Sequence, residues 1–225
     1  MTVHRNRYVV GISGASGALY ARAVVRGILS AGSECHLCVT PYGSRLLFDE
    51  LGIERLEGDS LQQFVGNDVS DELGTSFRER LLYYPPRDVG AAPGSGSFRH
   101  SGMVIVPASS HTLNSIAMGV GDTLVTRAAA VALKERMPLV IAHRETPLTL
   151  IDIRAMETLT LAGAIVAPCN PGFYLMPQRV SDIVDFVAGR LLDLLKVPHN
   201  LKVRWESHLK AQGGPGGSDD PSVSA

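Results

Sequence analysis

The most constraining feature of the sequence is an apolar run, Pro-Leu-Val-Ile-Ala at residues 138–142, which lies between charged segments at 134–136 and 143–145. A run without polar alternation is typical of a strand that is buried on both faces of a parallel sheet. Ligands of open α/β sheets bind beyond the carboxyl ends of the strands, and Arg144 and Glu145 directly follow this run. We therefore expect both residues to belong to a functional site.

The same strand-like pattern recurs along the chain and alternates with helix-like segments. Apolar runs that end in polar or glycine-rich turns lie at 7–12, 34–39, 103–107, 138–142 and 163–168. Helical periodicity occurs at 19–30, 44–51, 110–118, 123–136, 148–161 and 180–195. Repeated strand–helix units predict an α/β fold, a doubly wound parallel sheet with helices on both faces.

The length of 225 residues predicts a single domain, which we assign to residues 1–210. Residues 52–99 break the strand–helix rhythm with mixed charge, paired tyrosines and prolines and a Gly/Ser-rich loop, and we interpret them as an insertion with a lid. Residues 211–225 consist mainly of Gly, Pro, Ser and Asp and are expected to be disordered.

Bulk charge and cysteine content exclude several classes of protein. A formal net charge of −1 gives no electrostatic footprint for nucleic acid or anionic membrane, and no apolar window is long enough to span a bilayer. The first residues pass directly into a strand, so we expect a cytoplasmic protein and not a secreted one. Three cysteines agree with a reducing compartment; Cys35 and Cys38 are expected to point to opposite faces of a strand as inert thiols, and Cys169 to be a small loop residue.

The first turn, residues 11–18, has the spacing G-x-x-G-x-x-G between a strand and a helix. Glycines let the backbone approach a ligand, and free amides at a helix start attract phosphate. The spacing differs from the dinucleotide motif, and no acidic residue ends the second strand cleanly, so a mononucleotide such as FMN fits better than NAD. Tight packing of the turn is the alternative explanation for its glycines.

The third strand is followed by Ser109, Ser110, His111 and Thr112 at the expected start of a helix. Ser109 alone is explained as an N-cap. Four hydrogen-bonding side chains in succession exceed what a cap needs, and opposite the glycine-rich turn they are expected to hold a phosphate or the edge of a flavin.

Lys134 and Arg144 lie on opposite sides of the run at 138–142. A strand of this length spans about 16 Å at ~3.3 Å per residue, so one chain cannot easily direct both side chains at one small ligand. If both belong to the site, a neighbouring subunit supplies one of them. We therefore predict an oligomer with sites at its interfaces.

Four segments resemble the UbiX-type flavin prenyltransferases, once described as aromatic acid decarboxylases. They are GISGASGALYA, GSGSFRHSGMVIVPASSHT, RAAAVALKERMPLVIAHRETPL and GAIVAPCNPGFYLMPQRVSDIVDFVAGRLLDLL, and the resemblance covers most of residues 7–205. It implies a Rossmann-like (flavodoxin-like), dodecameric, metal-independent enzyme. Such an enzyme joins a dimethylallyl group from dimethylallyl phosphate to N5 and C6 of reduced FMN. The prenylated FMN then serves a UbiD-type decarboxylase.

The resemblance also assigns roles to residues of this sequence. It implies that FMN is held by Gly14, Ala15, Ser16, Thr40, Ser109, Ser110, His111, Thr112 and Arg144. It implies that Tyr174, Arg190 and Lys134 hold the dimethylallyl phosphate, with Lys134 also contributing to catalysis. Glu50 and Glu145 match the two catalytic glutamates, with Ser16 as a relay for protons. The sequence is compatible with either a monophosphate or a diphosphate donor.

Two other functions stay open at the level of sequence. Ala108 stands where the family commonly has cysteine, and the run Pro-Ala-Ser-Ser-His-Thr is similar to a motif of the FMN-dependent cysteine decarboxylases. That family also expects a histidine after the second strand and a P-x-M-N-x-x-M-W segment, and neither is present here. A non-catalytic flavin carrier is the second alternative, and it would not need Glu50, Glu145 or Tyr174.

Overall fold

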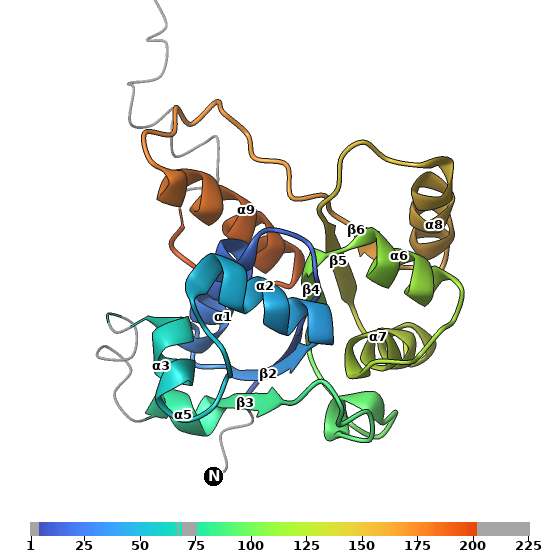
Figure 1. The fold of residues 1–225 in the computed structure, drawn as a ribbon, viewed down its shortest axis with the longest axis horizontal. Coiled ribbons are helices and arrows are strands. Elements are labelled where there is room, and N and C mark those ends of the chain that lie inside the picture. Colours follow the sequence, from blue (N-terminus) through green and yellow to red (C-terminus); the bar gives the residue numbers. More distant parts are fainter. Residues whose placement is uncertain (1–4, 67, 69–75, 202–225) are drawn as a thin grey trace, which may run out of the picture.

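The computed structural model describes residues 5–66, 68 and 76–201 of the chain. Its six strands form one parallel sheet in the order β3-β2-β1-β4-β5-β6 (Figure 1). The strands are β1 (Arg7–Ile12), β2 (Glu34–Val39), β3 (Leu81–Tyr84), β4 (Gly102–Ala108), β5 (Leu139–His143) and β6 (Ile165–Val166). The predicted doubly wound parallel sheet is confirmed, and its strand order reverses between β1 and β4.

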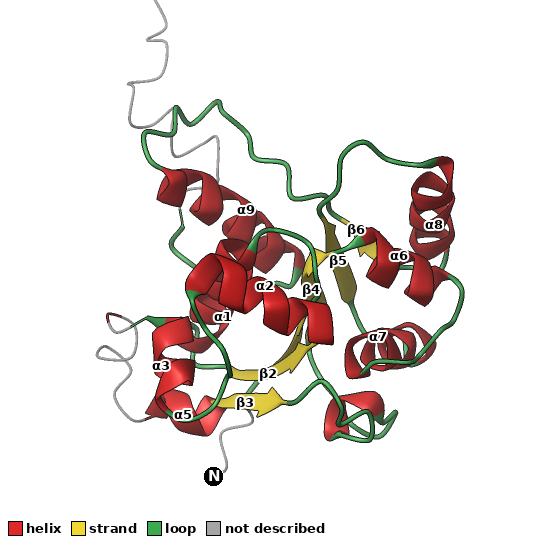
Figure 2. Cartoon of the chain, viewed as in Figure 1, coloured by secondary structure: helices red, strands yellow, loops and turns green. Residues whose placement is uncertain are grey.

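Helices cover both faces of the sheet (Figure 2). One face carries α1 (Ala18–Ser30), α2 (Pro41–Leu51), α3 (Asp59–Val65), α5 (Ser76–Arg80) and α9 (Val180–Leu194). The other face carries α6 (Ser110–Ala117), α7 (Leu124–Lys134) and α8 (Leu150–Leu161). Each face therefore has its own apolar core.

The strands supply side chains to both cores because neighbouring residues of a strand point to opposite faces. Val10 packs in the core beneath α1 and α9, whereas Val9 packs in the core beneath α7. Cys35 and Cys38 divide between the two cores in the same way, and burial raises the pKa of both thiols. Their predicted placement on opposite faces of the strand is confirmed.

Residues 52–99 contribute an integral strand that the sequence analysis missed. Leu81–Tyr84 forms β3, which pairs with β2 at the edge of the sheet, with Cys35 opposite Leu81. The same region also contains α3, α5 and a short 3₁₀ helix, η1 (Ala92–Gly94). A four-residue strand before two prolines carries too little periodicity to be recognised alone, and pairing with β2 decides its conformation. The interpretation of 52–99 as an insertion with a lid stays a prediction, and the region supplies the edge strand of the sheet.

Helix α2 begins three residues before the predicted start at 44. Thr40 is its N-cap, and the Thr40 hydroxyl accepts a hydrogen bond from the Gly43 amide at 3.0 Å. Pro41 follows at the first helical position, where its missing amide proton is not needed. The expected tail at 211–225, and residues 202–210 of the predicted domain, lie outside the described residues.

Helix α8 carries apolar side chains on its outer surface as well as toward the sheet. Leu150, Ile151, Ile153 and Leu161 are all more than half exposed, whereas Leu159 is buried. Arg154 and Glu157 are also exposed on this helix, but four large apolar side chains on one helix surface are typical of a surface that another protein covers. The outer surface of α8 therefore has the character of a protein–protein interface.

Candidate functional site

The carboxyl edge of the sheet brings together most of the predicted site residues. The segments that follow β1, β2, β4 and β5 all emerge at this edge, as parallel strands require. They carry Gly14, Ala15, Ser16, Thr40, Ser109, Ser110, His111, Thr112, Arg144 and Glu145. The edge also contains the point between β1 and β4 where the strand order reverses, which is the usual ligand position in such folds.

Ser13 links the loops after β1 and β4 by hydrogen bonds, at the position where the strand order reverses. It is fully buried, and its hydroxyl donates to the Pro107 carbonyl oxygen at 3.0 Å. The same Oγ accepts from the Ser109 amide at 2.8 Å. Sequence reasoning missed Ser13, although a serine directly after a buried strand, before Gly14, was a usable signal. Its hydrogen bonds fix the spacing between two predicted FMN-binding segments.

The glycines of the first turn are required mainly by packing. A Cβ on Gly14 would lie 2.4 Å from Cβ of Tyr42, so the turn after β1 directly contacts the start of α2. Gly17 has a φ of +131°, which favours glycine, and a Cβ there would lie 2.8 Å from the Tyr20 ring. Gly14 and Ser16 are nevertheless exposed, so the turn also presents bare backbone at the edge.

Glu50 of α2 occupies the amino-terminal end of α1. Its carboxylate accepts from the Ala18 amide at 2.8 Å and from the Gly17 amide at 3.1 Å. The Gly17 and Ala18 amides are therefore not free in this structure, and binding of a phosphate at this helix start stays a prediction. A carboxylate is already bound where an anion is favoured by the helix dipole, and it would repel a second anion.

Tyr20 is a further residue of this region that sequence reasoning missed. Burial raises the pKa of its hydroxyl, and Cys169 and Glu50 act in the same direction, whereas Arg144 opposes them. Glu50 and Arg144 therefore both lie within electrostatic reach of one tyrosine, although they come from α2 and from the loop after β5. The structure thus brings these two predicted residues into one neighbourhood.

The hydroxyls after β4 are largely engaged within the protein. Ser109 caps α6: its Oγ accepts from the Thr112 amide at 3.3 Å and donates to the Thr112 hydroxyl at 3.2 Å. Thr112 is buried, and Ser110 lies 3.1 Å from Nε2 of His143. His111 is exposed. The succession of four polar side chains therefore serves internal structure as well as the edge.

The loop after β5 carries Arg144 and Glu145 into the edge. The Arg144 amide donates to the Ala108 carbonyl oxygen at 3.0 Å, which extends the pairing of β5 with β4 beyond the strand. Glu145 is exposed, and its Oε1 accepts from the Thr146 amide at 3.0 Å. Arg144 thus has a fixed backbone and a partly exposed side chain.

Lys134 lies at the opposite, amino edge of the sheet. It ends α7, and its Nζ forms an ion pair of 2.7 Å with Glu135. A Cβ on Gly96 would lie 2.8 Å from the same Nζ, so Lys134 contacts the Gly/Ser-rich loop. Within one chain the structure does not bring Lys134 together with Arg144, because the whole of β5 separates them.

Tyr174 and Arg190 are both placed by helix α9. Tyr174 is in the segment between β6 and α9, is 42% exposed, and packs edge to face on Phe186. Arg190 follows Phe186 by four residues, one turn further along the same face of α9, and it forms an ion pair of 3.3 Å with Asp193. Lys134 lies at the amino edge, so the three predicted phosphate-binding residues are not assembled into one cluster within a single chain.

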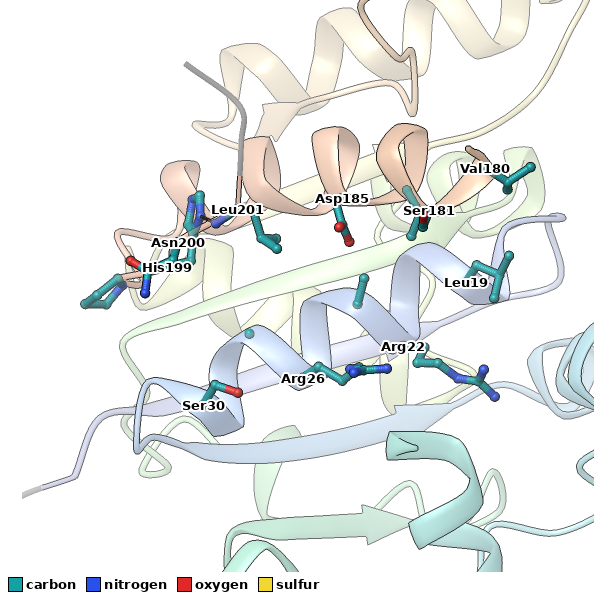
Figure 3. Close-up of a pocket in the computed structure, with 14 residues that line it drawn as sticks. Leu19, Arg22, Arg26, Ser30, Val180, Ser181, Asp185, His199, Asn200 and Leu201 are labelled. Atoms are coloured by element: carbon teal, nitrogen blue, oxygen red, sulfur yellow. Dashed lines mark hydrogen bonds between the residues drawn. The ribbon is translucent and has the colours of Figure 1, made fainter. Parts of the chain in front are cut away.

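A groove of about 760 Å³ lies between α1 and α9 (Figure 3). Leu19 and Val180 line one end of it, and Ser30 and His199 line the other. Arg26 faces the groove between these ends. The lining includes none of the predicted site residues, so this hollow and the carboxyl edge are separate features.

Cys169 lies beside the edge but is not a reactive thiol. It is 8% exposed, its Sγ donates to the Ala142 carbonyl oxygen at 3.4 Å, and burial raises its pKa to about 12. Within residues 5–66, 68 and 76–201, no cluster of three or more His, Cys, Asp or Glu is placed to hold a metal ion. In the same part of the chain, no helix has the length and apolarity that a membrane crossing requires.

Comparisons with known proteins identify the family. The profile of the Flavoprotein family matches residues 2–192. The flavin prenyltransferase UbiX of Streptomyces coelicolor is 41% identical over 207 residues, which cover 90% of this chain and 96% of that protein.

Two solved structures are similar over most of the chain, each with a TM-score of 0.73 and 33% identity. The first is AnUbiX (PadA1) in complex with FMN and dimethylallyl pyrophosphate, and the match covers 86% of this chain and 93% of the chain in that structure. The second is a dodecameric FMN-dependent UbiX-like decarboxylase from Escherichia coli O157:H7, and the match covers 88% of this chain and 98% of the chain in that structure. This chain belongs to the Flavoprotein family and, within it, to the UbiX flavin prenyltransferases.

Proposed function

We propose that this protein is a flavin prenyltransferase that transfers a dimethylallyl group from dimethylallyl phosphate to N5 and C6 of reduced FMN and releases phosphate. Membership of the UbiX family supports the reaction class. The observation that carries the proposal at the level of residues is the placement of two carboxylates at the carboxyl edge: Glu50 against the turn that holds Ser16, and Glu145 in the loop after β5. A carrier that only binds flavin has no need for Glu50, Glu145 or Tyr174.

The donor groups at this edge suit FMN. Arg144 offers a planar guanidinium, which binds phosphate in a bidentate manner, and Ser16 and His111 present exposed polar side chains. We assign FMN binding to Gly14, Ala15, Ser16, Thr40, Ser109, Ser110, His111, Thr112 and Arg144. Thr40 and Ser109 act in this assignment by fixing the starts of α2 and α6, because their hydroxyls cap those helices. When bound, reduced FMN supplies the nitrogen and carbon that accept the prenyl group.

The basic residues are assigned to the departing phosphate. Breaking an allylic C–O bond builds negative charge on the phosphate, and Lys134, Arg144 and Arg190 carry the positive charge to neutralise it. Tyr174, with an exposed hydroxyl-bearing ring, is assigned as a hydrogen-bond donor to the same group. The assignment covers both a monophosphate and a diphosphate donor.

Glu50 and Glu145 are assigned to proton removal as the new bonds form. A general base must lie within hydrogen-bond reach of the proton that it removes. Glu145 is exposed at the edge, and Glu50 lies against the turn that contains Ser16, which is assigned as a relay. The two carboxylates thus approach the edge from the loop after β5 and from α2.

The complete site is proposed to form between subunits of an oligomer, with a dodecamer as the expected state. The separation of Lys134 from Arg144 by the length of β5 supports a site that draws on more than one chain. The exposed apolar side chains of α8 support burial of that helix against a neighbouring copy. The three free cysteines support a reducing, cytoplasmic location, and the product is proposed to serve a UbiD-type decarboxylase.

The reaction is tested by mass spectrometry of the flavin. Purified protein with reduced FMN and dimethylallyl monophosphate should yield a flavin that is heavier by the prenyl group and has a changed absorption spectrum. Tight FMN binding without a change in mass would favour the carrier function instead. Release of carbon dioxide from a cysteinyl peptide would favour the cysteine decarboxylase function.

The role of Glu145 is tested by Glu145→Gln, which keeps an oxygen for the Thr146 amide and removes the charge. We expect turnover to fall on the order of 100-fold while FMN stays bound. Glu79→Gln removes an exposed carboxylate at the amino edge and is the matched control. Unchanged turnover in Glu145→Gln would remove Glu145 from the mechanism.

A further inference from the structure

A buried carboxylate, that of Asp152, lies directly behind the loop that carries Arg144 and Glu145. It is 3% exposed, in the first turn of α8. Its Oδ2 accepts from the Thr149 amide at 2.9 Å and from the Thr149 hydroxyl at 2.6 Å. Asn114 of α6 donates to its Oδ1 at 3.1 Å. A carboxylate with this many donors stays ionised, and the hydrogen bonds from Thr149, with those from Asn114 and Ser110, hold the pKa of Asp152 well below its usual range.

A second branch connects Asp152 to the end of β5. The Ser110 side chain lies near Asp152 and helps to lower the pKa of that carboxyl, and its Oγ lies 3.1 Å from Nε2 of His143.

The two branches meet at the two ends of one loop. Residues 144–149 connect β5 to α8; Thr149 at one end is bound to Asp152, and His143 at the other end lies 3.1 Å from the Ser110 hydroxyl, beside the same carboxylate. The carboxylate also accepts from Asn114 in the second turn of α6, the helix that Ser110 begins. One buried charge thus joins the loop with Arg144 and Glu145 to the helix start that follows β4.

We propose that Asp152 is a positioning residue, which fixes Arg144 and Glu145 relative to the amino-terminal turn of α6. The inference rests on the proposed function, because it assigns those two side chains to the reaction. Asp152 is buried, and its carboxylate accepts from Thr149 at the end of the loop and from Asn114 of α6. It therefore acts through geometry, by keeping the guanidinium and the carboxylate of the loop at a constant distance from the flavin-binding segment.

The test compares Asp152→Ala and Asp152→Asn with Arg80→Lys as the control. Arg80 is also a buried charged residue, and its Nη1 donates a hydrogen bond of 2.6 Å to the Leu29 carbonyl oxygen. It directly precedes β3 at the amino edge of the sheet, away from the carboxyl edge that carries the candidate site. We expect Asp152→Ala to lower kcat on the order of 10- to 100-fold, because small displacements of reacting groups have effects of this size. KM for the dimethylallyl phosphate should change less than kcat. Arg80→Lys should lower stability in urea without lowering kcat.

Asp152→Asn keeps the shape of the side chain, and its amide oxygen can still accept from Thr149. The side-chain amide of Asn114 can turn to present its oxygen to the new amide group. We therefore expect kcat of Asp152→Asn to lie between those of the wild type and Asp152→Ala. Equal kcat values for wild type and Asp152→Ala, or an equal loss in Arg80→Lys, would overturn the proposal.

Hydrogen exchange separates this proposal from the proposed function. The amides of residues 144–149 and 110–114 should exchange faster in Asp152→Asn than in the wild type, whereas those of β1 should not. If the wild type transfers no dimethylallyl group, the function fails and the exchange result alone decides whether Asp152 fixes the loop. Unchanged exchange in both segments would overturn the positioning role even in an active enzyme.

Discussion

Replacing Glu50 by alanine should destabilise the protein by about 1.5 kcal/mol, apart from any effect on turnover. The carboxylate caps α1 through the Gly17 and Ala18 amides, and Gly17, the N-cap residue, has no side chain to replace it. Loss of an N-cap costs about 1 kcal/mol. Loss of a negative charge at the positive end of a helix costs a further ~0.3–1 kcal/mol. Glu50→Gln keeps one acceptor oxygen and should lose about 1 kcal/mol.

Urea unfolding of the wild type, Glu50→Gln and Glu50→Ala measures this series, and the matched control is Asp49→Ala. Asp49 is the preceding carboxylate of α2 and pairs with exposed Arg45, so its removal should cost about 0.5 kcal/mol or less. The amides that Glu50→Ala leaves free should also bind inorganic phosphate, which should raise the urea midpoint of this variant more than that of the wild type. A loss in Glu50→Ala no larger than that in Asp49→Ala would refute the capping role.

Ser13→Ala leaves the Ser109 amide without its acceptor and should cost about 2 kcal/mol in urea unfolding, whereas exposed Ser30→Ala should be neutral. Gly17→Ala should destabilise more than Gly32→Ala, because both have positive φ but only the Cβ at 17 meets a side chain, and thermal unfolding should rank them in that order. Burial lowers the pKa of His100 from 6.5 in the unfolded chain to about 4 in the folded protein. Between these two pH values the unfolded chain binds more protons than the folded protein. The free energy of unfolding should therefore fall as pH is lowered from about 6.5 to about 4. Unfolding of the wild type and of His100→Gln at pH 7.5 and 5 should show a smaller loss in the variant; an equal loss would exclude His100 as a cause.

The fold was largely predictable because each buried strand carries its own signal. The apolar runs at β1, β2, β4 and β5 need no partner to be recognised, since burial on both faces requires apolar residues throughout. β3 was missed because its four residues become a strand only by pairing with β2, a contact that connects distant parts of the chain.

The site was predictable by residue type but not by arrangement. The sequence places Arg144 and Glu145 after a strand, and the structure confirms that the strand end lies there. It does not reveal that Glu50 folds back onto the Gly17 and Ala18 amides, or that Asp152 supports the loop from behind. Both contacts join helices that are far apart in the sequence. The periodicity of a helix indicates which of its faces is polar, but it does not indicate which distant residue that face contacts.

The placement of Lys134 and Glu145 at opposite ends of β5 has a genetic consequence. Suppose that each site takes Lys134 from one chain and Glu145 from another. In an assembly that mixes chains altered at Lys134 with chains altered at Glu145, some sites then contain both altered residues and other sites contain neither. Chains with Lys134→Ala and chains with Glu145→Gln would each have strongly reduced activity alone, yet their co-expression would restore intact sites. A single strand that separates two half-sites thus makes the gene capable of complementation between its own alleles.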